Sequence, residues 1–291
     1  MKGVKDGIEK WTSRLMPSLL ILILLLTIYV LTLEGAVEGL RVYLIPDFSQ
    51  ILNVQLIVSA MGQAFFSLSL GVGTMLIYGS YVSSEENLPS LARSVTLIDI
   101  GIAVLAGMLI VPAIYVAQAS GIEVYSETGQ LIEGDGLIFN ILPALFTSMG
   151  SIGTVVSITF FFLLTLAALT SSISMLEVPV SYVVESGRMP RVKAALVISL
   201  IIGIVCAIII VNFESLFAFV VSLTTEYSQP VLGFFLAIYT AWVWSRDKVL
   251  TELRSGFNDV ETSLFWKVWP FYIKFVCPVA ILVVFAQQLF R

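Results

Sequence analysis

Residues 61–82 read MGQAFFSLSLGVGTMLIYGSYV and carry the feature that decides the fold. The stretch is apolar enough to enter a membrane, yet Ser67, Ser69, Gly71 and Gly73 fall at its centre. Glycine costs about 1 kcal/mol relative to alanine inside a helix, and serine side chains compete for backbone hydrogen bonds. We therefore predict a helix interrupted at mid-membrane depth, whose freed backbone groups face a polar cavity or a ligand. The alternative is a continuous helix whose small residues form a packing seam.

The composition of the whole sequence is that of a membrane protein. Of 291 residues, 58% are hydrophobic and 12% are charged, whereas soluble domains carry about 25% charged residues. We therefore expect a multi-pass protein of the cell membrane, with the lipid bilayer as its solvent. The sequence has no histidine, which removes the commonest acid/base catalyst, and its net charge of −5 argues against a nucleic-acid partner. The absence of an Asn-x-Ser/Thr sequon favours a prokaryotic source.

Seven apolar segments are candidates for spanning helices, each of which needs about 20 residues. They are 16–33, 53–81, 94–118, 151–185, 194–212, 215–244 and 268–290. Most of the 15 Lys and Arg residues fall on one side of this arrangement: four in 1–15, one in 82–93, three in 186–193 and four in 245–267. By the positive-inside rule, we predict a cytoplasmic N-terminus. Segment 137–150 is too short to span and predicts a re-entrant or capping hairpin, and 34–52 predicts a polar external loop.

Hydroxyl-bearing residues form a second polar group, in the segment 151–185. Ala167, Thr170 and Ser171 are spaced i, i+3 and i+4, so they share one face of a helix. One carbonyl and two hydroxyls on that face offer three hard oxygen ligands to a small cation. The alternative is hydrogen bonding between helices, which Ser and Thr commonly provide in membranes.

Two carboxylates, Asp99 and Glu177, also fall within predicted spans. A carboxylate at mid-membrane depth is costly and is therefore a functional candidate. Each has a structural alternative. Glu177 would serve as an internal hydrogen-bonded strut, and Asp99, about a turn and a half from Arg93, would snorkel to the membrane interface.

These motifs together resemble the neurotransmitter:sodium symporter family of secondary transporters, whose bacterial members carry amino acids. GQAFFSLSLGVG (62–73) is similar to the family's unwound sixth helix, and LTSSISMLE (169–177) to its eighth. Three further stretches are similar to its external loops and its tenth helix: GAVEGLRVYLIPDFSQIL (35–52), FNILPALF (139–146) and SLTTEYSQPVLGFFLAIYTAWVW (222–244). The resemblance implies an all-α membrane protein with about seven transmembrane helices, the second half of an inverted-repeat, leucine-transporter-like fold.

The resemblance also implies a division of the chain. Residues 1–34 correspond to the family's fifth helix, 35–52 to an external loop, 53–244 to the second inverted repeat with helices six to ten, and 245–291 to a cytoplasmic loop and the eleventh helix. The first four family helices have no counterpart, so we expect a fragment that acts with a missing N-terminal half.

By resemblance, the expected function is sodium-coupled symport of an amino acid or related small amphiphile by alternating access, without enzymatic chemistry. The implied substrate-binding residues are Phe66, Ser67, Ser69, Val72, Ser171 and Met175. The implied ligands of the sodium ions are Ser67 and Asp99 at site one, and Ala167, Thr170 and Ser171 at site two. The family's external gate carries an Asp where this sequence has Val221, with Glu226 over a turn further on. The competing hypothesis is a non-transporting remnant or a membrane interaction module.

Overall fold

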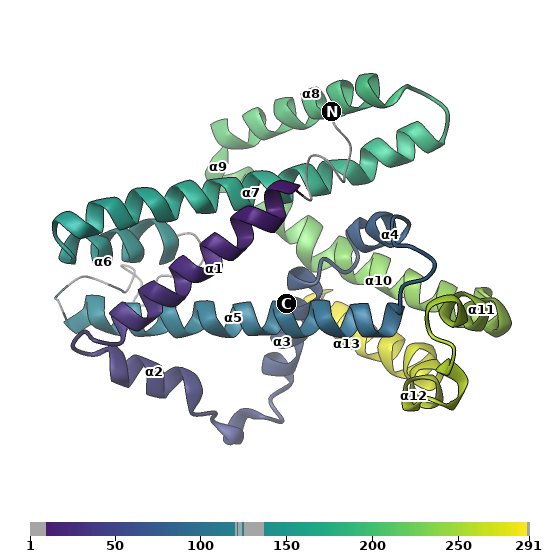
Figure 1. Ribbon diagram of the computed structural model, residues 1–291, viewed down its shortest axis with the longest axis horizontal. Helices are drawn as coiled ribbons and strands as arrows, with labels where there is room; N and C mark the ends of the chain where they lie inside the picture. Colours follow the sequence, from purple (N-terminus) through teal and green to yellow (C-terminus); the bar gives the residue numbers. More distant parts are fainter. Residues whose placement is uncertain (1–9, 120, 122–123, 125–136, 290–291) are drawn as a thin grey trace. The chain divides into compact units, whose positions relative to one another are not determined.

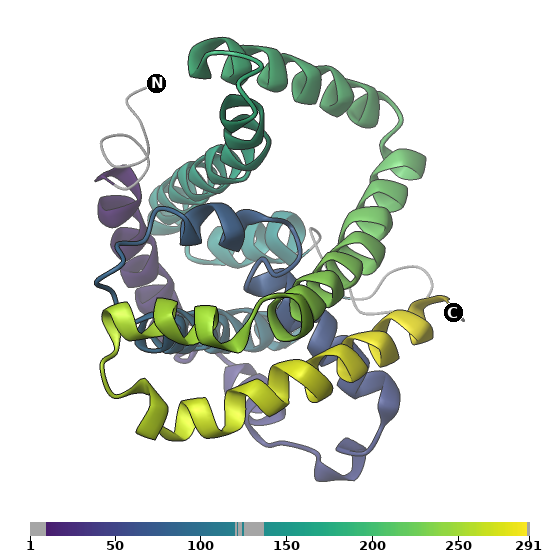
Figure 2. The ribbon, with the colours of Figure 1, turned by 90° about the vertical axis from the view of Figure 1, so that its right-hand side faces the viewer.

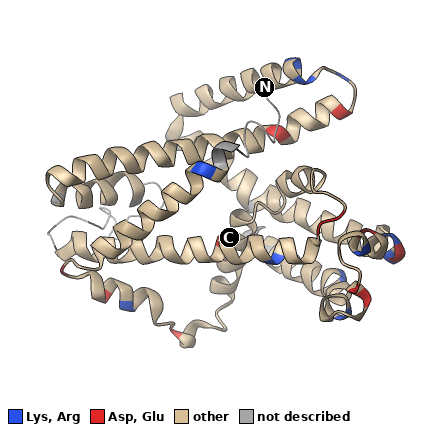
Figure 3. Ribbon diagram, viewed as in Figure 1, with Lys and Arg blue, Asp and Glu red and all other residues tan. Residues whose placement is uncertain are grey.

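The computed structural model describes residues 10–119, 121, 124 and 137–289. Throughout these residues the regular elements are helices, and none is a strand, which confirms the all-α class (Figure 1). Five helical stretches are long and apolar enough to cross a membrane: Ser13–Val30, Leu88–Ala119, Ser151–Glu185, Arg191–Val211 and Leu264–Val283. Charged residues lie mainly toward helix ends and in connecting segments (Figure 3). Asp99 in α5 and Glu177 in α7 are exceptions, since both lie inside long apolar helices.

The two other predicted spans are built from shorter pieces. Segment 53–81 contains α3 (Val54–Ser67) and α4 (Thr74–Gly79), separated by non-helical residues. Segment 215–244 consists of α9 (Phe213–Val221), a π-helix η4 (Ser222–Ser228), α10 (Gln229–Ile238) and a second π-helix η5 (Tyr239–Val243). Neither therefore appears as one long α-helix, and the total of seven spans remains a prediction.

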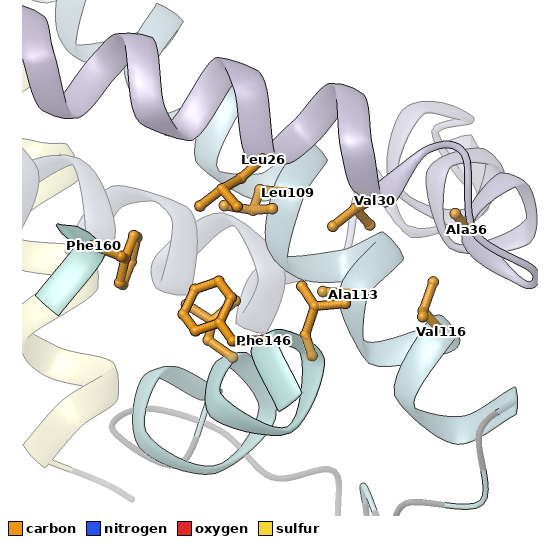
Figure 4. Close-up of a cluster of buried hydrophobic side chains, with 10 residues drawn as sticks. Leu26, Val30, Ala36, Leu109, Ala113, Val116, Phe146 and Phe160 are labelled. Atoms are coloured by element: carbon orange, nitrogen blue, oxygen red, sulfur yellow. The ribbon is translucent and has the colours of Figure 1, made fainter. Parts of the chain in front are cut away.

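One compact unit comprises Met1–Phe48 and Ile100–Ile173. It contains α1 (Lys10–Val30), α2 (Ala36–Leu44), the π-helix η3 (Leu137–Ile141), α6 (Leu142–Ser148) and parts of α5 (Leu88–Ala119) and α7 (Ser151–Glu185). Its apolar core is drawn from α1, α2, α5, α6 and α7, as Figure 4 shows. The core residues include Leu26 and Val30 of α1, Leu109 and Ala113 of α5, Phe146 of α6 and Phe160 of α7.

Two loop predictions can be compared with this unit. The segment 137–150 does not span: α6 folds onto the core and buries Leu142 and Leu145 completely or nearly so. The segment 34–52, predicted as an external loop, contains α2 and a 3-10 turn η2 (Phe48–Gln50). The helix α2 packs closely on α5, because a Cβ at Gly39 would lie 2.7 Å from the Cα of Pro112. The acidic residues Glu123, Glu127, Glu133 and Asp135 lie outside the described residues.

The second compact unit comprises Ser49–Asp99 and Ser174–Arg291. Besides α3, α4 and α9 to η5, it contains α8 (Arg191–Val211), α11 (Arg246–Gly256), η6 (Val260–Thr262), α12 (Leu264–Phe271), the π-helix η7 (Tyr272–Val276) and α13 (Cys277–Leu289). Helices α10 and α13 run side by side, and both contact α3 (Figure 2). The Asn53 side chain caps α3 by accepting hydrogen bonds from the backbone N–H groups of Gln55 and Leu56, which fixes where this helix begins.

Candidate functional site

The break between α3 and α4 is made by residues with left-handed backbone conformations. Ser69 has φ of 52°, and Gly71 and Gly73 have φ of 82° and 81°. A right-handed helix cannot pass through such residues, and glycine adopts them without the penalty that a Cβ imposes. The predicted interruption is therefore confirmed. Ser69 is the one non-glycine residue with positive φ in the described part of the chain, so this turn carries local backbone strain.

The break lies directly against the start of α10. A Cβ on Gly71 would lie 2.1 Å from the carbonyl oxygen of Gln229, too close for any side chain. Gln229 is only 4% exposed. The continuous helix of the alternative interpretation is therefore not present, but a small residue is still required for packing here, because Gly71 is needed both for its φ and for the close approach.

Three buried side-chain atoms near the break form no hydrogen bond with the described residues. They are Oγ1 of Thr74, the hydroxyl of Tyr78 and Oε1 of Gln229. Thr74 begins α4, and Tyr78 lies one turn further along the same helix. Buried polar groups are almost always hydrogen-bonded in native proteins. These three atoms could pair with a polar ligand or with water, and the predicted polar cavity at the break stays a prediction.

Ser67 and Asp99 lie within hydrogen-bonding distance in the structure. The Ser67 hydroxyl, at the end of α3, is 2.9 Å from Oδ1 and 2.8 Å from Oδ2 of Asp99, on α5. No ion pair joins Asp99 to Arg93 in the described residues, so the carboxylate engages the broken helix rather than its basic neighbour. Two carboxylate oxygens and a hydroxyl oxygen are the ligand types that a hard cation prefers.

Ala167, Thr170 and Ser171 occupy one unbroken helix, α7, as the spacing predicted. The Thr170 hydroxyl donates to the carbonyl oxygen of Ala167 at 2.8 Å. Within the helix the Ala167 carbonyl also accepts the Ser171 N–H, so the Thr170 bond occupies its second lone pair. A cation would reach this carbonyl by replacing the Thr170 hydrogen bond, with the Thr170 hydroxyl oxygen turned to the ion.

The remaining predicted pocket residues lie on or beside these elements. Phe66 is 56% exposed at the end of α3, and Met175 is 54% exposed on α7. Ser69 and Val72 belong to the break itself. At the predicted external gate, Val221 ends α9, and the side chain of Glu226 lies outside the described residues.

Glu177 lies at the centre of a hydrogen-bonded cluster. The sequence predicted a hydrogen-bonded strut as one alternative for this residue, but not its partners. Its side chain, 7% exposed, accepts hydrogen bonds from the Tyr81 hydroxyl at 2.8 Å and the Ser181 hydroxyl at 2.9 Å. Nη2 of Arg191 lies 2.7 Å from both carboxylate oxygens. The structure thus shows Glu177 as a fully hydrogen-bonded strut. No partner of Glu177 was predicted from the sequence. The i+4 spacing of Ser181 on α7 could have indicated that residue, but Tyr81 lies in the turn after α4 and Arg191 begins α8, which spacing alone does not reveal.

A broken helix with a carboxylate beside the break, in an all-helical membrane chain, is the arrangement in which secondary transporters hold their cargo. Comparisons with known proteins agree. The family model described as the sodium:neurotransmitter symporter family matches residues 1–291. The chain therefore belongs to the sodium:neurotransmitter symporter family, whose members are sodium-dependent transporters and not enzymes.

Individual relatives support the same assignment. A sodium-dependent transporter of Haemophilus influenzae is 36% identical over 99% of the chain, and YhdH of Bacillus subtilis is 33% identical over 98%. The crystal structure of MhsT in complex with L-phenylalanine superposes with a TM-score of 0.83 at 36% identity, over 98% of this chain and 64% of MhsT. The chain spans 62% of the length of each of the two bacterial relatives. It is a multi-pass membrane protein.

Proposed function

We propose that the chain takes part in sodium-coupled symport of an amino acid or a related small amphiphile. The observation that carries this proposal is the Ser67 hydroxyl shared between both oxygens of Asp99 at the point where α3 ends. A carboxylate within a spanning helix is stabilised when a cation neutralises it. The proposal is supported by relatives in Drosophila, 25% identical and named sodium-dependent nutrient amino acid transporter 1, and by the L-phenylalanine complex of MhsT.

In this proposal, two sodium ions bind at separate ligand sets. Ser67 and Asp99 contribute to the first, and Ala167, Thr170 and Ser171 contribute to the second. Phe66, Ser69, Val72 and Met175, with Ser67 and Ser171, line the pocket for the amino acid. Because the relatives are longer than this chain, we propose that helices corresponding to their remaining length supply the other ligands, and that the N-terminus of this chain is cytoplasmic.

The test is sodium binding by Asp99→Asn, measured with radioactive sodium on the transporter reconstituted together with those further helices. The substitution keeps the shape of the side chain and removes its charge. We expect sodium affinity to fall at least tenfold, about 1.4 kcal/mol. The control is Glu252→Gln, on α11 and exposed, which removes the same charge away from the break. Unchanged sodium affinity in Asp99→Asn would contradict the proposed first ligand set.

A further inference from the structure

A groove of about 510 Å³ lies between the first turns of α5 and the α11–α12 segment, all within the second compact unit. Its walls are almost entirely apolar. Ala92 and Leu97 line it from α5, Leu253 from α11, and Phe265 and Trp269 from α12. The one charged side chain in its lining is that of Arg93.

The walls of this groove are fixed by the surrounding structure. The Asn87 side chain caps α5 by accepting a hydrogen bond from the Ser90 N–H at 3.0 Å. The end of α11 packs against the loop that precedes α5, because a Cβ at Gly256 would lie 1.9 Å from the carbonyl oxygen of Glu86. A ligand would therefore meet a surface that needs little ordering, which lowers the entropic cost of binding.

The α12 wall is a stack of aromatic rings. The rings of Phe265 and Trp269 stack with centroids 5.7 Å apart, and Trp266 extends the stack at 6.2 Å from Trp269. Trp266 is buried with Val249 and Val260 in a small core, which anchors the stack. Tryptophan is enriched at membrane interfaces, where its ring sits at the level of the lipid headgroups.

Arg93 supplies a cation that the described protein does not neutralise. It forms no ion pair in the described residues, whereas Arg254, next to the groove residue Leu253, is paired with Glu261 at 2.5 Å. Glu85 and Glu86 lie in the loop before α5, but neither bridges to Arg93. Arg93 lies in the second turn of a helix that continues as an apolar span, so its charge is placed where a headgroup meets the hydrocarbon.

We propose that this groove binds a phospholipid with an anionic headgroup, its phosphate against Arg93 and one acyl chain between α5 and the Phe265–Trp269 wall. Guanidinium matches phosphate by paired hydrogen bonds. The predicted side of the membrane also fits, because the basic connecting segments face the cytoplasm and the anionic lipids concentrate in that leaflet. The proposal concerns lipid regulation or anchoring and is independent of the sodium and substrate sites.

The test is native mass spectrometry of the purified, delipidated 291-residue chain titrated with phosphatidylglycerol or phosphatidylcholine of the same acyl composition. Both lipids carry a phosphate, but the choline ammonium of phosphatidylcholine offsets its charge, so we expect tighter binding of phosphatidylglycerol. Arg93→Gln should reduce its affinity about fivefold, to the level of phosphatidylcholine, since one basic residue near an anionic surface contributes about 1 kcal/mol. Arg93→Lys should retain most of the preference. The control Arg41→Gln, an exposed basic residue on α2, should change nothing.

Two further measurements distinguish a lipid seated in the groove from a headgroup bound at the surface and from a site for free phosphate. Ala92→Trp fills the groove and should weaken both lipids, which distinguishes a seated acyl chain from a headgroup held at the surface. Excess inorganic phosphate should not displace phosphatidylglycerol, which excludes a site for free phosphate. Circular dichroism confirms that each variant is folded. Equal affinity for the two lipids, or an unchanged preference for phosphatidylglycerol in Arg93→Gln, would overturn the proposal. Undiminished lipid binding by Ala92→Trp would also overturn it, because the lipid would then bind elsewhere and the groove would be left to another protein segment.

Discussion

At the residue scale, the oxygens of α7 allow the second proposed sodium site to be tested without disturbing the helix. Thr170→Ala combined with Ser171→Ala removes two of a handful of ligands from a small hard ion, while alanine preserves helix propensity. Sodium affinity of the complete transporter should fall at least tenfold, about 1.4 kcal/mol. The matched control is Ser172→Ala. Its hydroxyl also donates to a backbone carbonyl of the same helix, that of Ala168 at 2.8 Å, but Ser172 is not one of the proposed ligands. An unaltered sodium dependence of transport in the double variant would exclude the site.

The Glu177–Arg191 pair makes a different prediction, because its carboxylate is buried while Arg191 is 46% exposed. Arg191→Met leaves Glu177 with only two hydroxyl donors, and a buried charge that loses its partner is destabilising. Discounting for the exposure of Arg191, we expect the free energy of unfolding to fall by about 2 kcal/mol. The comparison is Arg254→Met, which breaks the pair with Glu261, half exposed on both sides, and should cost less than about 1 kcal/mol. Denaturation of both variants in detergent, followed by circular dichroism, measures the difference. Equal losses would show that burial does not decide the strength of these pairs.

At the element scale, the break between α3 and α4 was predictable because its cause is local. Serine and glycine at alternate positions disfavour a helix whatever surrounds them, and the positive φ values of Ser69, Gly71 and Gly73 bear this out. The π-helices were not predictable in the same way. In η4 the Ser228 hydroxyl donates to the Leu223 carbonyl, five residues back, and the Thr225 hydroxyl donates to the Val221 carbonyl. These side chains supply hydrogen bonds to backbone carbonyls of the widened turns. The π-helix also packs against α13, a contact between segments distant in the sequence. The helix α2 was missed for a related reason, since its segment reads as polar but gains a partner in α5.

Gly71→Ala tests the element-level account. The added methyl would meet the Gln229 carbonyl at 2.1 Å in a backbone conformation that alanine rarely adopts, so either the break or α10 must move. We expect substrate and sodium affinity to fall together by at least tenfold, because both depend on the geometry of the break. Gly62→Ala is the control, since a Cβ at that position of α3 meets nothing within 4 Å. Binding to Gly71→Ala that matches the wild type would show that the close approach is not needed.

At the scale of the whole molecule, the distribution of basic residues predicts the orientation in the membrane. The structure adds one consistent detail: Nζ of Lys274 lies 4.5 Å from the ring centroid of Trp242, near the end of η5, just before the basic segment at 245–267. With the predicted orientation, this contact would direct a lysine inside a span toward the cytoplasmic side, as snorkelling requires; the orientation itself stays a prediction.

Single cysteines in a background without Cys206 and Cys277 test this orientation. A cysteine at position 188 should react with a membrane-impermeant reagent only from the cytoplasmic side, and one at position 127 only from outside. The physical reason is that Lys and Arg near span ends are retained on the cytoplasmic side during insertion. Labelling in the opposite sense at either position would refute the predicted topology.

Family, fold class and the broken helix followed from the sequence, whereas the partners of Glu177 and the close contact of Gly71 with α10 required the structure. What these parts achieve together is best tested by amino-acid uptake into proteoliposomes that contain this chain with the further helices spanned by its relatives. An inward sodium gradient should drive accumulation of a labelled amino acid such as L-phenylalanine, and an equal potassium gradient should not. Accumulation that is the same under both gradients, or absent under both while the protein is folded and inserted, would contradict sodium-coupled transport and favour a non-transporting membrane interaction module.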